Sequence, residues 1–143
     1  MAIQGFFGLY YIIAILSAWL LSVLLKSIVF AFKEKSFSLR NGFSNGGMPS
    51  SHSAVVSSVT AAVFMMQGFS DLFFVALVFS LIVISDAFGF RRNVGVQGDT
   101  INNILKGLKK DPVKVVHGHT FFQVLAGIIL GVLAAVITYY TWF

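Results

Sequence analysis

Three long apolar stretches dominate this chain, and each is long enough to cross a lipid bilayer. They cover residues 6–29, 72–88 and 121–140, and about 20 residues suffice for a helix to cross a hydrocarbon core of about 30 Å. Only 10% of the residues are charged, whereas a soluble domain carries about a quarter. The first stretch lacks the basic flank of a cleaved signal sequence and is too long for one. The sequence predicts a single-domain integral membrane protein over residues 1–143.

A fourth apolar segment, residues 51–66, is shorter and rich in serine, threonine and alanine. Small residues allow helices to approach closely in membranes, so we expect this helix to be central and shielded from lipid. Residues 89–118 are polar and basic. Four apolar residues there follow a helical spacing, namely Ile101, Ile104, Leu105 and Leu108. The predicted fold class is therefore an all-α polytopic bundle of four membrane helices plus an amphipathic helix lying at the interface.

The basic residues predict how the bundle is oriented. All ten lysines and arginines fall within residues 26–40 and 91–114, which four spans would place on one face. The positive-inside rule makes that face cytoplasmic and puts both termini outside the cell membrane. A net charge of +5 also suits nucleic acid, but no basic helix or aromatic platform supports that partner. Anionic lipid headgroups are the simpler partner, and a homo-oligomer remains open.

The segment Gly46-Gly47-Met48-Pro49-Ser50-Ser51-His52-Ser53-Ala54 predicts a phosphate site at a helix start. Glycines free the backbone, and proline is favoured in the first turn of a helix. The positive end of the helix dipole would then favour an anion beside Ser50 and Ser51. His52 stands in the same turn, where its imidazole can donate or accept a proton. The alternative interpretation is an ordinary helix start capped by serine.

The third apolar stretch ends in an aspartate that is followed by two arginines. Asp86 lies at the end of this stretch, where an ionisable group is costly and usually functional. Its carboxylate can orient Arg91 or Arg92, whose guanidinium groups bind phosphate oxygens in pairs. Alternatively, both arginines serve only as topology anchors. The sequence does not tell which arginine reaches a phosphate.

The last apolar stretch is preceded by His117-Gly118-His119 and contains Gln123. His119 and Gln123 are four residues apart and therefore neighbours on a helix face. A side-chain acceptor fixes one ring nitrogen of the histidine and leaves the other as a nucleophile. Alternatively, the two histidines simply lie near headgroups. A third interpretation is a metal site formed by His52, His117, His119 and Asp86. It is weaker, because no H-x-x-x-H or carboxylate-rich motif accompanies these residues.

Three motifs, GGMPSSHSA, DAFGFRRNVGVQGDTIN and GHTFFQVLAG, together resemble the divergent branch of the type 2 phosphatidic acid phosphatase superfamily. That superfamily also includes vanadium-dependent haloperoxidases and bacterial lipid phosphatases. The resemblance covers roughly residues 20–132. It implies phosphoryl transfer through a phosphohistidine without metal or cofactor. By motif position, it makes His119 the nucleophile, His52 the acid that protonates the leaving oxygen, and Ser51 a phosphate ligand.

The opening K-x6-R pattern of the superfamily is matched by Lys33 and Arg40, and Lys26 is a rival for the lysine role. Gln123 stands where a carboxylate usually orients the nucleophile, and Asn41 replaces the proline expected after Arg40. These departures concern the catalytic residues and not the fold.

A further departure is the superfamily's arginine shortly before the nucleophile, which is missing here. Val113 and Lys114 occupy that neighbourhood. We expect Arg91 or Arg92 to supply the charge instead.

The residues and the resemblance together predict a lipid phosphatase that hydrolyses a lipid phosphate monoester or diphosphate. A cytoplasmic site favours phosphatidylglycerol phosphate or phosphatidic acid, whereas undecaprenyl diphosphate would suit the opposite face. The main alternative is a catalytically degenerate membrane protein that binds anionic lipid or scaffolds a complex, and Gln123 favours it. A transporter is disfavoured by four short spans without paired repeats.

Overall fold

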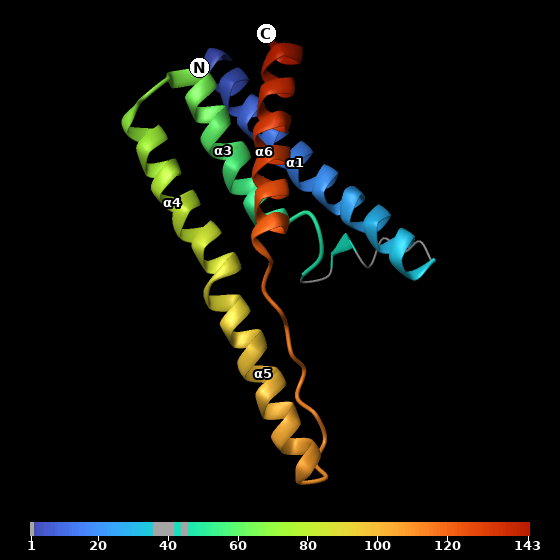
Figure 1. The fold of residues 1–143 in the computed structure, drawn as a ribbon. Coiled ribbons are helices and arrows are strands. Elements are labelled where there is room, and N and C mark those ends of the chain that lie inside the picture. The colour runs from blue at the N-terminus through green and yellow to red at the C-terminus, as the bar shows by residue number, and fades with distance from the viewer. Residues whose placement is uncertain (1, 36–41, 44–45) are drawn as a thin grey trace.

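The computed structural model describes residues 2–35, 42–43 and 46–143, and the side chains of residues 2–7 and 33 are not described. Within these residues the chain is helical and has no strand, which confirms the predicted fold class. The helices are α1 (Ala2–Glu34), α3 (Ser51–Gln67), α4 (Asp71–Phe88), α5 (Phe90–Gly107) and α6 (Phe121–Trp142) (Figure 1). The four predicted membrane helices correspond to α1, α3, α4 and α6.

Helix α3 lies at the centre of the bundle and packs against α1, α4 and α6. Its buried residues are mostly small, and its hydroxyl groups bond to neighbouring helices. Ser58 Oγ donates to the carbonyl of Ala14 on α1 at 2.8 Å, and Thr60 Oγ1 lies 2.7 Å from Ser80 Oγ on α4. A small hydroxyl-bearing helix is therefore enclosed by larger apolar ones, as its composition predicts.

Helix α6 approaches α3 closely because it carries Gly127 and Gly131, a G-x-x-x-G pair on one face. A Cβ atom at Gly127 would lie 3.0 Å from the Ser53 Cβ, and one at Gly131 would lie 2.9 Å from the Ala54 carbonyl carbon. Larger residues would push the helices apart. The tight crossing fixes the start of α6 beside the start of α3, where the predicted catalytic residues lie.

Among the described residues, three helical stretches are long and apolar enough to cross a membrane: Gly8–Phe32, Asp71–Gly107 and Phe121–Trp142. The 17 residues of α3 extend only about 25 Å at 1.5 Å per residue. The chain nevertheless runs through the bundle four times, so the start of α1 and the end of α6 lie at the same end (Figure 1). This arrangement is the one that four spans require.

The amphipathic helix expected at the interface is α5, but its direction differs from the expectation. It continues α4 almost in line and projects beyond the bundle instead of turning across its end (Figure 1). The reason is that helical hydrogen bonding passes through Gly89, whose N–H donates to Ser85 at 2.9 Å and whose carbonyl accepts from Asn93 at 3.1 Å. If α4 crosses the membrane, α5 therefore extends out of it.

Candidate active site

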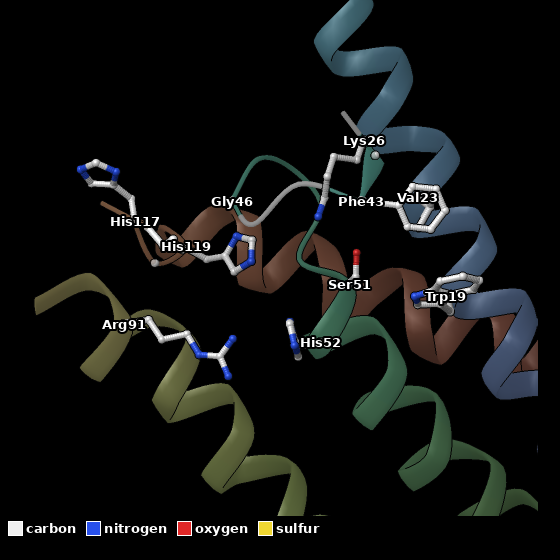
Figure 2. A pocket seen from close by; sticks show the side chains of 13 residues that line it. Trp19, Val23, Lys26, Phe43, Gly46, Ser51, His52, Arg91, His117 and His119 are labelled. Atoms are coloured by element: carbon white, nitrogen blue, oxygen red, sulfur yellow. The ribbon is translucent and has the colours of Figure 1, made fainter. Parts of the chain in front are cut away.

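A cavity of about 180 Å³ lies at the end of the bundle where α3 and α6 begin. It contains five of the residues predicted for the site: Lys26, Ser51, His52, Arg91 and His119 (Figure 2). These residues come from α1, α3, α5 and the segment before α6, which are far apart in the sequence. The structure thus brings both predicted catalytic histidines to one cavity.

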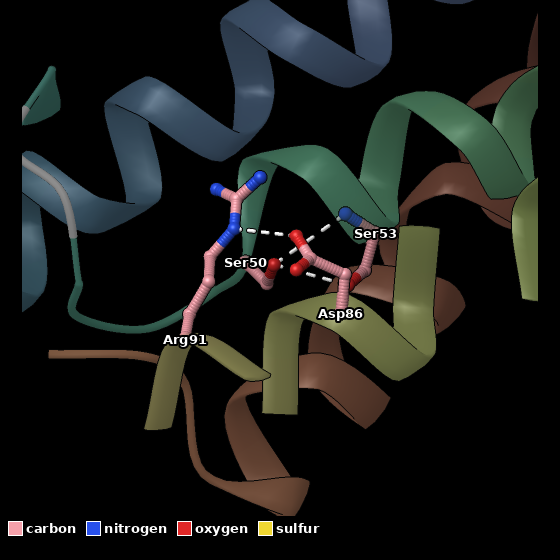
Figure 3. A network of polar contacts seen from close by, with 4 residues as sticks. All are labelled: Ser50, Ser53, Asp86 and Arg91. Atoms are coloured by element: carbon pink, nitrogen blue, oxygen red, sulfur yellow. Dashed lines mark hydrogen bonds and ion pairs between the residues drawn. The ribbon is translucent and has the colours of Figure 1, made fainter. Parts of the chain in front are cut away.

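The start of α3 forms one wall of this cavity. Ser50 is the N-cap residue, and its hydroxyl accepts hydrogen bonds from the backbone N–H of Ser53 at 3.4 Å and from the Ser53 hydroxyl at 3.0 Å (Figure 3). Ser50 is fully buried and does not line the cavity. Its position favours a capping role over the direct phosphate contact predicted for it. Pro49 precedes the cap and therefore stands outside the first helical turn where the sequence pattern places it.

Ser51 differs from its neighbour because its side chain faces the cavity (Figure 2). Its Oγ is buried and has no hydrogen-bond partner within the described part of the chain. A buried hydroxyl without a partner is costly, and a bound acceptor would remove that cost. The helix dipole of α3 favours an anion at the same place. The cavity is therefore suited to a phosphate oxygen beside Ser51.

The glycine pair gives the chain its turn into this helix. Gly46 and Gly47 have positive φ angles of 97° and 83°, which residues with a Cβ rarely adopt. The turn brings Gly46 to the cavity wall. The Ser50 N–H then donates to the Gln123 carbonyl of α6 at 3.0 Å. Backbone hydrogen bonding thus joins the two helix starts on which the histidines depend.

His119 is held between the end of α4 and the start of α6. Its N–H donates to the Ala87 carbonyl at 3.0 Å, and its side chain is only 5% exposed. A Cβ atom on the preceding Gly118 would lie 2.7 Å from the Arg91 carbonyl carbon, so only glycine permits this close passage. The His119 Nδ1 lies 3.3 Å from Gln123 Oε1.

Gln123 favours the tautomer of His119 that carries its proton on Nδ1. Its Oε1 accepts the Thr120 N–H at 3.0 Å, as part of a capping box at the start of α6. A backbone N–H can only donate, so the atom facing it must be the amide oxygen. The same oxygen can accept from His119 Nδ1–H, and in that tautomer the lone pair is on Nε2. This is the tautomer that a nucleophilic histidine requires.

Burial lowers the pKa of His119 below its ordinary value, and the nearby positive charge of Lys26 acts in the same direction. The hydrogen bonds to Gln123 and to the Gly47 backbone oppose this shift in the pKa. The balance favours the neutral imidazole at pH 7. A neutral ring is the form that can attack phosphorus.

Lys26 enters the cavity from α1 and is only 3% exposed. Its amine points toward the space between Ser51 and His119 (Figure 2). The positive charge of Lys26 therefore lies beside the space that a phosphate group would occupy. Of the two lysines considered from sequence, Lys26 is the one that the structure places in the cavity. The side chain of Lys33 is not described, and Arg40 lies outside the described residues.

Arg91 supplies the cavity's second positive charge. Its Nε lies 2.6 Å from Asp86 Oδ2 (Figure 3), and its terminal nitrogens point toward His52 (Figure 2). Asp86 thus orients the guanidinium group from behind, as its position in the sequence suggests. Arg92 is exposed and does not line the cavity. The structure therefore distinguishes the two arginines that the sequence leaves equivalent.

The segment between α5 and α6 runs back along α5 and completes the cavity. The side chain of Asn102 pairs with the backbone of Val113 through hydrogen bonds of 3.0 and 2.8 Å. His117 Nε2 lies 2.8 Å from Asp99 Oδ2 on α5.

The sequence also allows a metal site as a weaker interpretation. In the part of the chain that the structure describes, no three His, Cys, Asp or Glu residues gather where they could hold a metal ion.

His117 and Gly118, which stand beside His119 in the sequence, also line the cavity. The remaining lining residues lie outside the three motifs: Trp19, Val23, Gly42, Phe43 and Val116. The sequence contains a signal that could have identified two of them, Trp19 and Val23. Trp19 and Val23 stand seven and three residues before Lys26, a spacing that places all three on one face of α1. Once Lys26 is taken as a phosphate ligand, its helix face predicts the other two.

Comparison with known proteins gives one family and one curated relative. The model of the Divergent PAP2 family matches residues 8–134. An uncharacterized membrane protein of Bacillus subtilis (strain 168), YuiD, is 33% identical over 115 residues, covering 68% of this chain and 73% of that protein. No solved structure matches. The matched range contains every residue of the cavity.

Proposed function

This chain belongs to the Divergent PAP2 family of membrane proteins, and on that premise we propose that it is a metal-independent lipid phosphatase acting through a phosphohistidine. The observation that carries the proposal is the single cavity that His52, His119, Ser51, Lys26 and Arg91 line together. It combines a nucleophile, an acid and two positive charges around a space suited to a phosphate group.

The first step transfers the phosphoryl group to His119. The Nε2 lone pair attacks phosphorus while the bond from phosphorus to the lipid oxygen breaks. Protonated His52 gives its proton to that oxygen, so the lipid leaves as an alcohol and not as an alkoxide. Lys26, Arg91 and the α3 N-terminus stabilise the charge on the phosphoryl oxygens, which is the main source of rate enhancement in such transfers.

The second step returns the enzyme to its starting state. A water molecule attacks phosphorus and gives a proton to His52, which is now neutral. The bond from phosphorus to His119 Nε2 breaks, and inorganic phosphate leaves. In both steps Gln123 Oε1 accepts a hydrogen bond from His119 Nδ1–H. It cannot stabilise a positively charged ring as a carboxylate would, so its contribution is orientation and tautomer choice.

We place the cavity on the cytoplasmic face of the cell membrane and both termini outside. All ten basic residues fall within residues 26–40 and 91–114, and the described parts of these two segments lie at the end of the bundle opposite the start of α1 and the end of α6 (Figure 1). Phosphatidylglycerol phosphate and phosphatidic acid are then the favoured substrates.

The orientation can be tested by cysteine labelling. The chain contains no cysteine, so Lys109→Cys introduces a unique thiol. This thiol should react with a membrane-impermeant maleimide only after the cells are permeabilised. Labelling of intact cells would place the cavity outside and favour undecaprenyl diphosphate.

The decisive experiment is an assay of phosphate release by the purified full chain in EDTA. Phosphatidylglycerol phosphate, phosphatidic acid and undecaprenyl diphosphate would be presented in the same mixed micelles. We expect EDTA-resistant release of phosphate from at least one lipid, and we expect His119→Ala to abolish this release.

Gln123 favours a second candidate function, a degenerate protein that binds lipid phosphates without hydrolysing them. Binding without release from any of the lipids would support that candidate and contradict the phosphatase.

A further inference from the structure

A second cavity adjoins the first and is apolar. It has a volume of about 290 Å³ and lies between α1, α3 and α4. Three residues, Trp19, Ser51 and His52, line both cavities. The other lining residues are Val55, Val56, Phe79 and Val83. The phosphate-sized cavity therefore continues past His52 into a hydrocarbon-lined space.

We propose that this second cavity, the chain site, holds the hydrocarbon chain of the lipid phosphate next to its leaving oxygen. The inference rests on the proposed function. In an in-line displacement the leaving oxygen stands opposite the nucleophile, and His52 must reach that oxygen to protonate it. The hydrocarbon is attached to this oxygen. It must therefore extend from the side of His52, which lines both cavities, and away from His119, which lines only the first.

The chain site is open sideways to the lipid phase. Within the described residues no Cα atom of α1 lies within 8 Å of one in α4, so these two helices do not pack directly against each other over α3. Trp19 of α1 and Phe79 of α4 form the two rims, and they are 37% and 60% exposed. A lipid in the membrane could thus place its phosphate in the first cavity while its chain stays in an apolar environment.

A larger apolar cavity, about 480 Å³, lies between α3, α4 and α6. It shares no lining residue with the phosphate cavity or with the chain site. A chain lying there would be separated from His52 by α3 itself. Size alone would favour this cavity, but continuity with the proposed acid favours the chain site.

The kinetic test uses matched variants that narrow one cavity each. Val83→Phe narrows the chain site, and Val132→Phe narrows the larger cavity. The substrates are hexadecyl phosphate and butyl phosphate, which differ only in chain length. Val83→Phe should lower the ratio of kcat/KM for the long substrate to that for the short one about tenfold, the effect of losing about two buried methylene groups. Val132→Phe should keep the wild-type ratio. The reverse pattern, or no change in either variant, would overturn the chain site.

A binding test separates failure of the chain site from failure of the proposed function. Phosphatidic acid brominated along its acyl chains is compared with equally brominated phosphatidylcholine in the same vesicles, using His119→Ala to prevent turnover. Subtracting the signal of a further Trp19→Phe variant isolates the fluorescence of Trp19. We expect phosphatidic acid to quench Trp19 more strongly than phosphatidylcholine does, and Val83→Phe to reduce the difference. Excess quenching without hydrolysis by wild type would support the chain site and reject the phosphatase. Hydrolysis with equal quenching by both lipids would reject the chain site.

Discussion

His117 and His119 stand two residues apart, but the structure gives their side chains different surroundings. The His117 side chain is 59% exposed and pairs with Asp99 on α5. His119 is almost fully buried, and its Nδ1 faces the amide oxygen of Gln123. Residue type alone gives both rings the same chemistry. Burial and a fixed acceptor on one nitrogen are what distinguish a candidate nucleophile from a surface histidine.

The same contrast occurs at two other pairs of identical neighbours. Ser50 caps α3 and is enclosed, whereas Ser51 presents a buried hydroxyl to the cavity. Both arginines are exposed, but Arg91 pairs with Asp86 and lines the cavity, whereas Arg92 does not line it. In each pair the two neighbouring side chains point in different directions. His117 lines the edge of the cavity, but its ring points away from the centre (Figure 2). Substituting both members of each pair therefore tests whether position determines function.

The largest expected difference is between His119→Ala and His117→Ala. Loss of the nucleophile should lower kcat for phosphate release by at least the 10²–10⁴-fold typical of general acid–base groups. His117→Ala should change kcat by less than about threefold, since its ring pairs with Asp99. Phosphate release from the substrate identified in EDTA measures both. Equal losses in the two variants would remove the basis for assigning the nucleophile.

His52→Ala should slow hydrolysis of the lipid substrate about as much as His119→Ala does. The two variants should differ in how their rates depend on the leaving group. Removing the acid slows departure of an alcohol strongly and departure of a good leaving group little. The test is the ratio of kcat/KM on an alkyl phosphate to kcat/KM on p-nitrophenyl phosphate, because kcat/KM reports the first step and not the later hydrolysis in which His52 also acts. We expect this ratio to fall at least tenfold in His52→Ala. His119→Ala should be slow on both substrates, and a similar ratio in both variants would contradict the separate roles.

Arg91→Ala and Arg92→Ala should differ by a smaller factor. Removing one preorganised donor to a developing charge typically costs about 10²–10³-fold in kcat, and Arg91 is the arginine whose terminal nitrogens point into the cavity. Arg92→Ala should stay within about threefold of wild type. If Arg92→Ala showed the greater loss in kcat, the cavity described above would not be the phosphate site.

Much of this architecture could be predicted, because it depends on the composition of each segment and on the spacing of its apolar residues. Apolar length predicts α1, α4 and α6, and small residues predict that α3 is central. The segment from Gly46 to His52 predicts a helix start with an anion site, which is a local property of backbone and capping residues. Burial could not be predicted in the same way. It depends on which face of each helix meets another, and a single sequence does not fix that.

The direction of α5 shows the same limit. Its apolar spacing predicts an amphipathic helix, and amphipathic helices often lie flat on a membrane. Here the hydrogen bonds through Gly89 continue α4 into α5, and the segment that returns to α6 packs along α5. Helical periodicity describes a helix by itself and contains no information on the angle at its junction. That angle determines where Arg91 lies.

The smallest kinetic effect should come from Gln123→Glu, and it concerns pH. A carboxylate beside the imidazole favours the charged ring and should raise the pKa of His119, which burial lowers in the wild type. The nucleophile must be neutral, so activity is lost as the pH falls through that pKa. The acidic limb of the pH–rate profile should therefore move to higher pH in Gln123→Glu. At pH values above that limb, kcat should equal or exceed that of wild type.

Gln123→Glu also keeps the capping box, because glutamate can accept the Thr120 N–H as glutamine does. The helix start should therefore be retained, and a change in the pH profile can be attributed to charge. Gln123→Ala is the matched control, since it removes both the acceptor for His119 and the side-chain half of the capping box while Thr120 remains as the N-cap. It should lower kcat and destabilise the fold by about 1 kcal/mol, the net contribution of one hydrogen bond. If the acidic limb stayed in place in Gln123→Glu, or moved to lower pH, His119 would not be the group whose neutral form is required. The contrast between His117 and His119 would then have no catalytic meaning.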